Sequence, residues 1–155
     1  MTKKLFFLLC LLLSANVMFA QQKTKTPFKQ AIPDLKKILI GSALPYKMVN
    51  DSLAVIPYEG DNFASYKVLV QKVSDLYIVY TNLTEALQGK IDETKFKYLL
   101  QQNDHYDVVK IGMSAGDGTV YLRADVYRIA TTATLLKRII AQVANVTNII
   151  GGDLK

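Results

Sequence analysis

Several chemically reactive residue types are scarce in this chain of 155 residues. It contains one cysteine (Cys10), one histidine (His105) and no tryptophan. Thiol chemistry, a transition-metal site and a Ser-His-Asp triad all depend on cysteine or histidine side chains. A metal site would need three or four converging ligands, and His105 is the only imidazole. We therefore expect no enzyme activity, no cofactor and no metal site.

The first twenty residues have the pattern of a secretory signal peptide. Lys3 and Lys4 supply positive charge, an unbroken apolar run follows over 5–13, and Ala20 is a small residue before Gln21. We place the cleavage point between Ala20 and Gln21 and expect a periplasmic or secreted protein. Cleavage would also remove Cys10.

An uncleaved membrane anchor is the weaker alternative for this segment. The apolar stretch 5–20 is interrupted by Ser14 and Asn16 and is shorter than the roughly 20 apolar residues that a spanning helix needs. After cleavage we expect no stable membrane span.

Positive charge is modest and spread along the chain. Without Lys3 and Lys4, 17 basic residues remain against 13 acidic ones, a net charge of +4. Only three of the 17 are arginines, and the lysines are scattered except in the leader 21–32. Nucleic-acid surfaces concentrate arginine and lysine on one face, so we expect no nucleic-acid partner.

The remaining residues, 33–150, have the length and apolar content of one domain. Periodicity predicts helices from about 34 to 41, 93 to 103 and 132 to 150. Gly41 is expected to end the first and Gly151-Gly152 the last, while 84–90 is predicted to be a loop. Strands are predicted at 46–49, 53–58, 66–73, 76–81, 108–113 and 119–128, and Pro57 indicates a strand end or a sheet edge.

This order predicts an α+β fold. Strands joined by hairpins, with helices at intervals, are typical of a two-layer sandwich with helices on one face of an antiparallel sheet. The element order is α-β-β-β-α-β-β-α, or has four strands before the second helix if 46–49 counts separately. The Gly116-Asp117-Gly118 segment lies between two strand patterns and is predicted to be a hairpin turn rather than a phosphate loop.

Alternation in the strand 119–128 gives the candidate binding surface. Its even-numbered apolar side chains should face the helices, which places Tyr121, Arg123, Asp125 and Tyr127 on the outer side. Tyrosine and arginine are enriched at protein-binding hot spots, so these four residues are the candidate partner-binding site. The alternative is a solvated outer face in which Arg123 and Asp125 pair with neighbouring strands.

The last helix has a wide apolar arc. Such a helix is either deeply buried or shared with a partner, and the sequence does not choose between the two. The arc comprises Leu135, Leu136, Ile139, Ile140, Val143, Val146, Ile149 and Ile150.

Two segments resemble the YbjN / type III secretion chaperone-like superfamily. LLQQNDHYDVVKIGMSAGDGTVYLRADV is similar to the family's helix, Asn-bearing turn, glycine corner and "VxLRA" strand, and LKKILIGSALPYKMV is similar to its first helix and strand. The resemblance covers about 33–150. It implies a non-enzymatic, often dimeric domain that binds protein partners, and the family has no catalytic motif to carry over.

Together these observations predict an exported, non-enzymatic protein-binding domain of the bacterial envelope, acting as a chaperone-like or regulatory adaptor. Its partner would be another protein, with a possible homodimer. The alternative is a small-molecule or lipid carrier with a pocket between helices and sheet.

Overall fold

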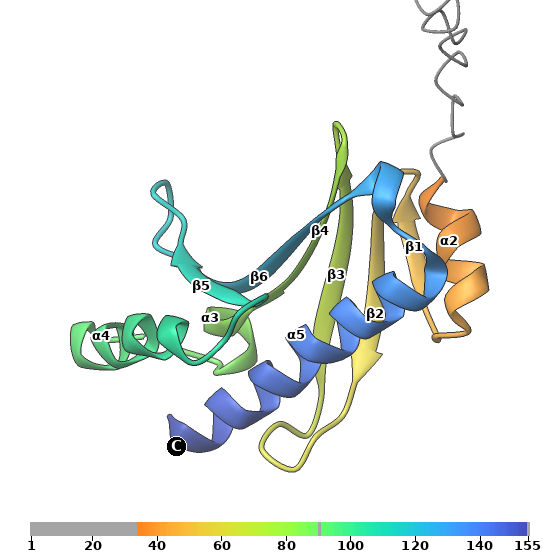
Figure 1. Ribbon diagram of the computed structural model, residues 1–155. Coiled ribbons are helices and arrows are strands. Elements are labelled where there is room, and N and C mark those ends of the chain that lie inside the picture. Colours follow the sequence, from red (N-terminus) through yellow and green to blue (C-terminus); the bar gives the residue numbers. More distant parts are fainter. Residues whose placement is uncertain (1–33, 90, 155) are drawn as a thin grey trace, which may run out of the picture. The chain divides into compact units, whose positions relative to one another are not determined.

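A six-stranded antiparallel sheet forms the centre of the computed structural model, which describes residues 34–89 and 91–154 (Figure 1). The strand order across the sheet is β1-β2-β3-β4-β6-β5. The strands are β1 (Lys47–Asn50), β2 (Leu53–Tyr58), β3 (Tyr66–Val73), β4 (Leu76–Asn82), β5 (Lys110–Met113) and β6 (Val120–Tyr127). The predicted signal peptide 1–20 and leader 21–32 lie outside the described residues.

Helices are the first and last elements of the described residues, and two more lie in the connection between β4 and β5. They are α2 (Leu35–Ser42), α3 (Leu83–Ala86), α4 (Glu93–Gln101) and α5 (Ala133–Asp153), with short 3-10 turns η1 (Gln102–Asp104) and η2 (Arg128–Ala130). Figure 1 shows α5 crossing the sheet, with α2 near its β1 end and α3 and α4 near its β5 end. The predicted α+β sandwich is confirmed, with β1 as a separate strand.

Alternate residues of the strands face the helices and form the core. Ala54, Ile56, Val68, Val70 and Val79 are at most 1% exposed. Helix α5 contributes Leu136, Ile140, Val143 and Ile150 to the same core, each 0% exposed. Burial of these side chains supplies the main driving force for folding. The face of the sheet that they occupy is called the inner face below.

The apolar arc of α5 is used mainly within the domain. Of its eight residues, only Ile149 is exposed, at 50%. The width of the arc is explained by contacts of α5 with both the sheet and α2. Burial is thus the main role of this helix, and Ile149 is the one arc residue with much free surface.

The final helix continues through Gly151 and Gly152 and ends at Asp153, which corrects the predicted end at this glycine pair. Phe63 explains the presence of Gly151 inside the helix, because a methyl group there would overlap the Phe63 ring. Gly151 therefore permits close packing rather than ending the helix.

Two further sequence predictions need correction. Gly41 lies inside α2, and Ala43 takes the left-handed backbone conformation after the helix (φ 54°). A methyl group at Gly41 would lie 3.0 Å from Ala133 Cβ, so this glycine allows α2 to approach α5. In the predicted loop 84–90, residues 83–86 form α3, because the Asn82 side chain accepts a hydrogen bond from Glu85 N–H at 2.9 Å.

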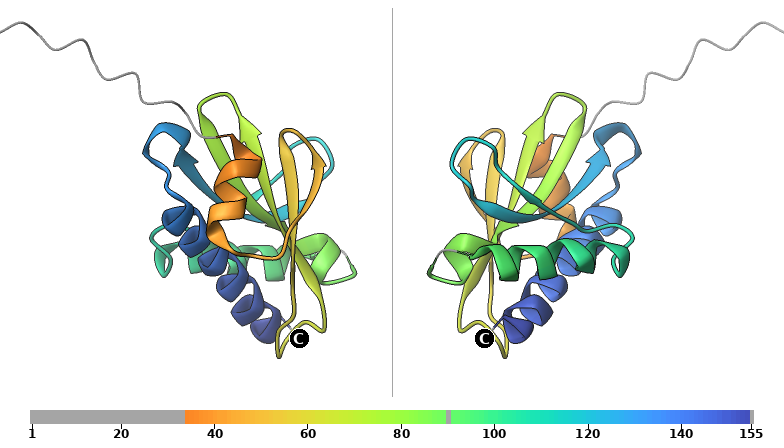
Figure 2. Two further views of the ribbon diagram at one scale, coloured as in Figure 1. Left: turned by 90° about the vertical axis from the view of Figure 1, so that its right-hand side faces the viewer. Right: turned by 90° about the vertical axis from the view of Figure 1, so that its left-hand side faces the viewer.

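Long-range hydrogen bonds attach β3 and the loop between β2 and β3 to α5. Tyr66 Oη donates to the Ala144 carbonyl at 3.0 Å. The Asn62 backbone N–H donates to Asn148 Oδ1 at 3.0 Å, and Asn62 Nδ2 donates to the Asn148 carbonyl at 2.8 Å. Tyr98 in α4 donates to Asp153 at the end of α5 at 2.9 Å, and Figure 2 shows α4 above that end of α5. The helices therefore hold the sheet from the inner side.

Candidate functional site: the outer face of the sheet

The candidate residues of β6 lie on the side of the sheet opposite the core. Val120, Leu122 and Ala124 are at most 2% exposed, whereas Tyr121 and Arg123 are half-buried and Asp125 and Tyr127 are exposed. The predicted alternation is therefore confirmed. We call the sheet side that bears these four residues the outer face.

Strand register extends this face across the whole sheet. Directly paired residues of neighbouring antiparallel strands point to the same side. Val55 pairs with Leu69, Leu69 with Tyr80, and Tyr80 with Arg123. Lys47 pairs with Val55 at one end and Lys110 with Arg123 at the other. We call this series the central row: Lys47, Val55, Leu69, Tyr80, Arg123 and Lys110.

The rows toward the β3–β4 turn also contain apolar and aromatic side chains. On one side, Gln71 pairs with both Leu53 and Ile78, and Ile78 pairs with Asp125. Further along, Leu76 pairs with Val73 and with Tyr127, which is 63% exposed. An antiparallel sheet open to water usually carries polar residues on its free side. The outer face is more apolar than that pattern.

Arg123 and Asp125 bind each other within β6. Arg123 Nε lies 2.6 Å from Asp125 Oδ1, and the second guanidinium nitrogen lies 2.7 Å from Oδ2. This two-point contact raises the pKa of Arg123 above its usual value. The pairing runs along one strand, not across to neighbouring strands as the sequence alternative supposed. It cancels the two charges locally and fixes the Arg123 side chain.

Three cavities open along the outer face and share residues. The smallest, about 200 Å³, is lined by Gln71, Ile78, Tyr80, Asn82, Thr119, Tyr121 and Arg123. A cavity of about 410 Å³ adjoins it and shares Tyr121 and Arg123. The largest, about 640 Å³, shares Asn82 with the smallest. The cavities therefore follow one another from the β2–β3 end of the sheet to β5.

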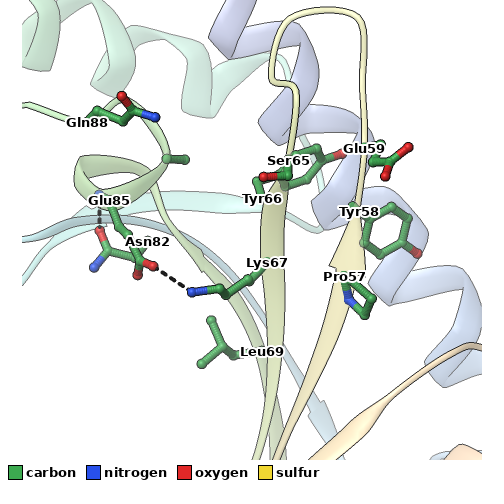
Figure 3. Close-up of a pocket in the computed structure, with 11 residues that line it drawn as sticks. Pro57, Tyr58, Glu59, Ser65, Tyr66, Lys67, Leu69, Asn82, Glu85 and Gln88 are labelled. Carbon is green, nitrogen blue, oxygen red and sulfur yellow. Dashed lines mark hydrogen bonds and ion pairs between the residues drawn. The ribbon is translucent and has the colours of Figure 1, made fainter.

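Figure 3 shows the largest cavity, which has a mixed lining. The Lys67 ammonium pairs with Glu85 at 3.0 Å across its mouth. Tyr58 and Tyr66 stack with ring centroids 5.8 Å apart, and burial raises the pKa of both phenols. Burial raises the pKa of Tyr80 in the neighbouring cavity as well. The cavity therefore combines two partly buried phenols with an ion pair at Lys67.

Sequence reasoning named only the β6 part of this surface. Alternation in β3 and β4 carries the same signal, since Leu69, Ile78 and Tyr80 fall on the opposite side from Val68, Val70 and Val79. The joining of these strands to Lys47 and Lys110 depends on sheet order and register, which the alternation of one strand does not specify.

The other two sequence motifs, at His105 and at 116–118, lie in turns. His105 ends the η1 turn and is exposed, and no group of metal-ligating side chains occurs in residues 34–89 and 91–154. The Gly116-Asp117-Gly118 segment joins β5 to β6, as predicted, with Gly118 at φ 71°. In the same part of the chain no helix has the length and apolar character needed to cross a bilayer.

No protein-family model matches the sequence, and no curated protein matches it.

Solved structures give clear matches in fold. A chain of the heterodimeric ExoU–SpcU complex from the type III secretion system of Pseudomonas aeruginosa has 14% identity and a TM-score of 0.52, covering 76% of this chain and 95% of that one. A chain of the HopA1–SchA chaperone-effector complex has 11% identity and a TM-score of 0.55, and the match covers 76% of this chain and 92% of that one. A chain of the ExsC–ExsE complex has 14% identity and a TM-score of 0.54, and the match covers 76% of this chain and 93% of that one.

These matches span nearly the whole of the compared chains and most of this one, at identities that establish the fold alone. The described domain has the type III secretion chaperone-like fold, the fold that its sequence resemblance implied.

Proposed function

We propose that this protein is an exported, non-enzymatic, chaperone-like adaptor that binds another protein through the outer face of its sheet. The observation that carries the proposal is the composition of that face. Half-buried apolar side chains such as Leu69, Ile78 and Tyr80 occupy its centre, and three adjoining cavities hollow it. A contiguous apolar surface on a soluble domain marks a site of association.

The compared structures support a protein as the ligand. All three are complexes between two different proteins, and HopA1–SchA is a chaperone-effector complex. The outer face also offers tyrosine and arginine, the residue types that contribute most to protein interfaces. Tyr121 and Tyr127 would supply contact area, and the Arg123–Asp125 pair would supply fixed polar groups.

Export distinguishes the proposed role from that of a cytoplasmic secretion chaperone. The signal-peptide pattern at 1–20 supports action in the envelope. A homodimer is part of the proposal, with the exposed Ile149 of α5 available at its surface. The carrier alternative is less favoured, because the space between α5 and the sheet is filled by fully buried side chains such as Leu122 and Ile140.

Site-specific photocrosslinking in the source cell tests this proposal. The full chain would carry a photoreactive residue in place of Tyr80, on the outer face, or in place of Lys97, an exposed residue of α4. We expect one abundant protein adduct from position 80 only. Tyr121→Ala with Arg123→Ala should reduce that adduct severalfold. Equal adducts from both positions, or none from position 80, would exclude the outer face as the binding surface.

A further inference from the structure

The two ends of the central row differ in charge from its middle. Within the row, Arg123 is paired with Asp125 at 2.6 Å, and in the adjoining row Lys67 is paired with Glu85 at 3.0 Å. Lys47 and Lys110 have no ion-pair partner among the described residues, and both are exposed. The uncompensated positive charge of this row is therefore placed at its two ends.

The Lys110 ammonium is oriented without being neutralised. Its Nζ donates to the Asn103 carbonyl at 3.0 Å and to the Tyr106 carbonyl at 2.6 Å. A lysine ammonium has three donors, so one remains for a ligand. Carbonyl oxygens carry no net charge, and the full positive charge of Lys110 is available beside the cavity that it lines with Arg123.

Between these ends the row is neutral and largely apolar. Val55, Leu69 and Tyr80 form its middle, and the Arg123–Asp125 pair carries no net charge. Strands in a sheet lie about 4.8 Å apart, so five intervals from β1 to β5 span about 24 Å along the sheet. An extended peptide covers this distance with about seven residues.

We infer that the outer face selects a protein segment in which a short apolar stretch is flanked on both sides by acidic residues. This inference rests on the proposed function and adds the chemistry of the partner. The apolar stretch lies over Val55, Leu69 and Tyr80, and the acidic ends lie at Lys47 and Lys110. Charge complementarity of this kind sets partner choice and register more than total affinity.

The segment is recognised through side chains on the face rather than as an added strand at β5. The outward backbone groups of Ile111 are already occupied by one side-chain amide. Asn103 Oδ1 accepts from Ile111 N–H at 2.7 Å, and Asn103 Nδ2 donates to the Ile111 carbonyl at 3.2 Å. A strand added at this edge would have to displace Asn103.

Matched synthetic peptides test the inference directly. One fluorescent peptide of about nine residues has five leucine and valine residues between two pairs of glutamates, and a second has lysines in place of the glutamates. Binding to the full chain is measured by fluorescence anisotropy at low and high salt. We expect the acidic peptide to bind about tenfold more tightly at low salt, and we expect salt to reduce the difference.

Protein variants locate the effect. Lys47→Glu and Lys110→Gln should each weaken the acidic peptide severalfold, whereas Lys97→Glu on α4 makes the same charge change as Lys47→Glu and should have little effect. Glutamine is chosen at position 110 because its amide can still donate to the Asn103 and Tyr106 carbonyls, whereas glutamate could not and would disturb the η1 turn.

The possible results separate the inference from the proposed function. Equal binding of both peptides, competed by each other and lost in Tyr121→Ala, would overturn the charge preference and leave the outer face as a protein-binding surface. Failure of both peptides to bind would overturn the inference on partner chemistry. The proposed function is tested separately by photocrosslinking from position 80.

Discussion

The Tyr121 ring lies directly over Gly112, its paired residue on the neighbouring strand β5. A methyl group at Gly112 would come within 2.8 Å of Tyr121 Cε2, Cζ and Oη. An aromatic ring that covers a cross-strand glycine in this way shields the backbone of the edge strand. The missing side chain at Gly112 therefore sets the position of Tyr121 on the outer face.

Gly112→Ala should move Tyr121 without removing any side chain from the binding surface. The contacted atoms are at the far end of the ring, which can swing away, so we expect unfolding free energy to change by less than about 1 kcal/mol. Capture at position 80 and binding of the acidic peptide should both fall severalfold. Gly116→Ala is the matched control, since a methyl group at Gly116 meets no atom within 4 Å. Unchanged binding in Gly112→Ala would show that the ring position is unimportant for recognition.

Gly151→Ala should destabilise the domain although alanine favours helices. The substitution gains up to about 1 kcal/mol in helix propensity. The new methyl group, however, would overlap the Phe63 ring, which is 8% exposed and packs against Tyr66 at a centroid distance of 5.7 Å. Overpacking of a buried site costs about 1–3 kcal/mol, so we expect a net loss in urea unfolding.

A double-mutant cycle shows whether the ring causes that loss. Phe63→Leu makes room for the methyl group, and the cost of Gly151→Ala should be smaller in that background. An equal cost in both backgrounds would mean that the loss has another origin.

Local sequence patterns were sufficient for elements whose structure is set by their own residues. The bounds of β2 and β3 were predicted to the residue, and the start of α4 at residue 93 and the alternation of β6 were predicted as well. The misassigned helix ends at Gly41 and Gly151 have a tertiary cause. In both cases a glycine accommodates a residue distant in sequence, Ala133 or Phe63.

The candidate site was only partly predictable for the same reason. Alternation placed Tyr121, Arg123, Asp125 and Tyr127 on the outer face. It could not place Lys47 and Lys110 at opposite ends of one row, because that row follows from the order and register of all six strands, and Lys47 and Arg123 are 76 residues apart in sequence. The within-strand Arg123–Asp125 pair was also missed, since the only pairing considered for these residues was with neighbouring strands.

Asn103→Ala should open the β5 edge. Without the side-chain amide, the Ile111 N–H loses its 2.7 Å acceptor and should exchange with solvent at least about tenfold faster. An exposed edge strand is a template for pairing with another chain, so we also expect a concentration-dependent rise in mass in light scattering.

Asn103→Asp is the control for the open edge. Its carboxylate keeps the acceptor for Ile111 N–H but cannot donate to the Ile111 carbonyl. Protection of the Ile111 amide should therefore persist in this variant. Equal protection in wild type, Asn103→Ala and Asn103→Asp would show that the amide does not close the edge.

Tyr66→Phe tests the bond between the sheet and α5, and its effect should depend on pH. Tyr66 Oη donates to the Ala144 carbonyl at 3.0 Å from a site that is 7% exposed, so its loss should cost about 1 kcal/mol at neutral pH. Burial, followed by the nearby Tyr58, raises the pKa of Tyr66 above 10.0 in the folded protein. The folded state thus holds this proton more tightly than the unfolded chain does.

The stability that comes from this proton is fully present below pH 10.0, the unfolded value, and is lost as pH rises through the raised folded pKa. The advantage of wild type over Tyr66→Phe in urea unfolding should therefore shrink above pH 10. Tyr127→Phe removes a hydroxyl from a ring that is 63% exposed and serves as the matched tyrosine control. A wild-type advantage that stays constant between pH 7 and pH 11 would contradict a buried, proton-donating Tyr66. A declining advantage would show that the hydroxyl donates to α5 and helps hold the sheet against that helix, whose position keeps the outer face free for a partner.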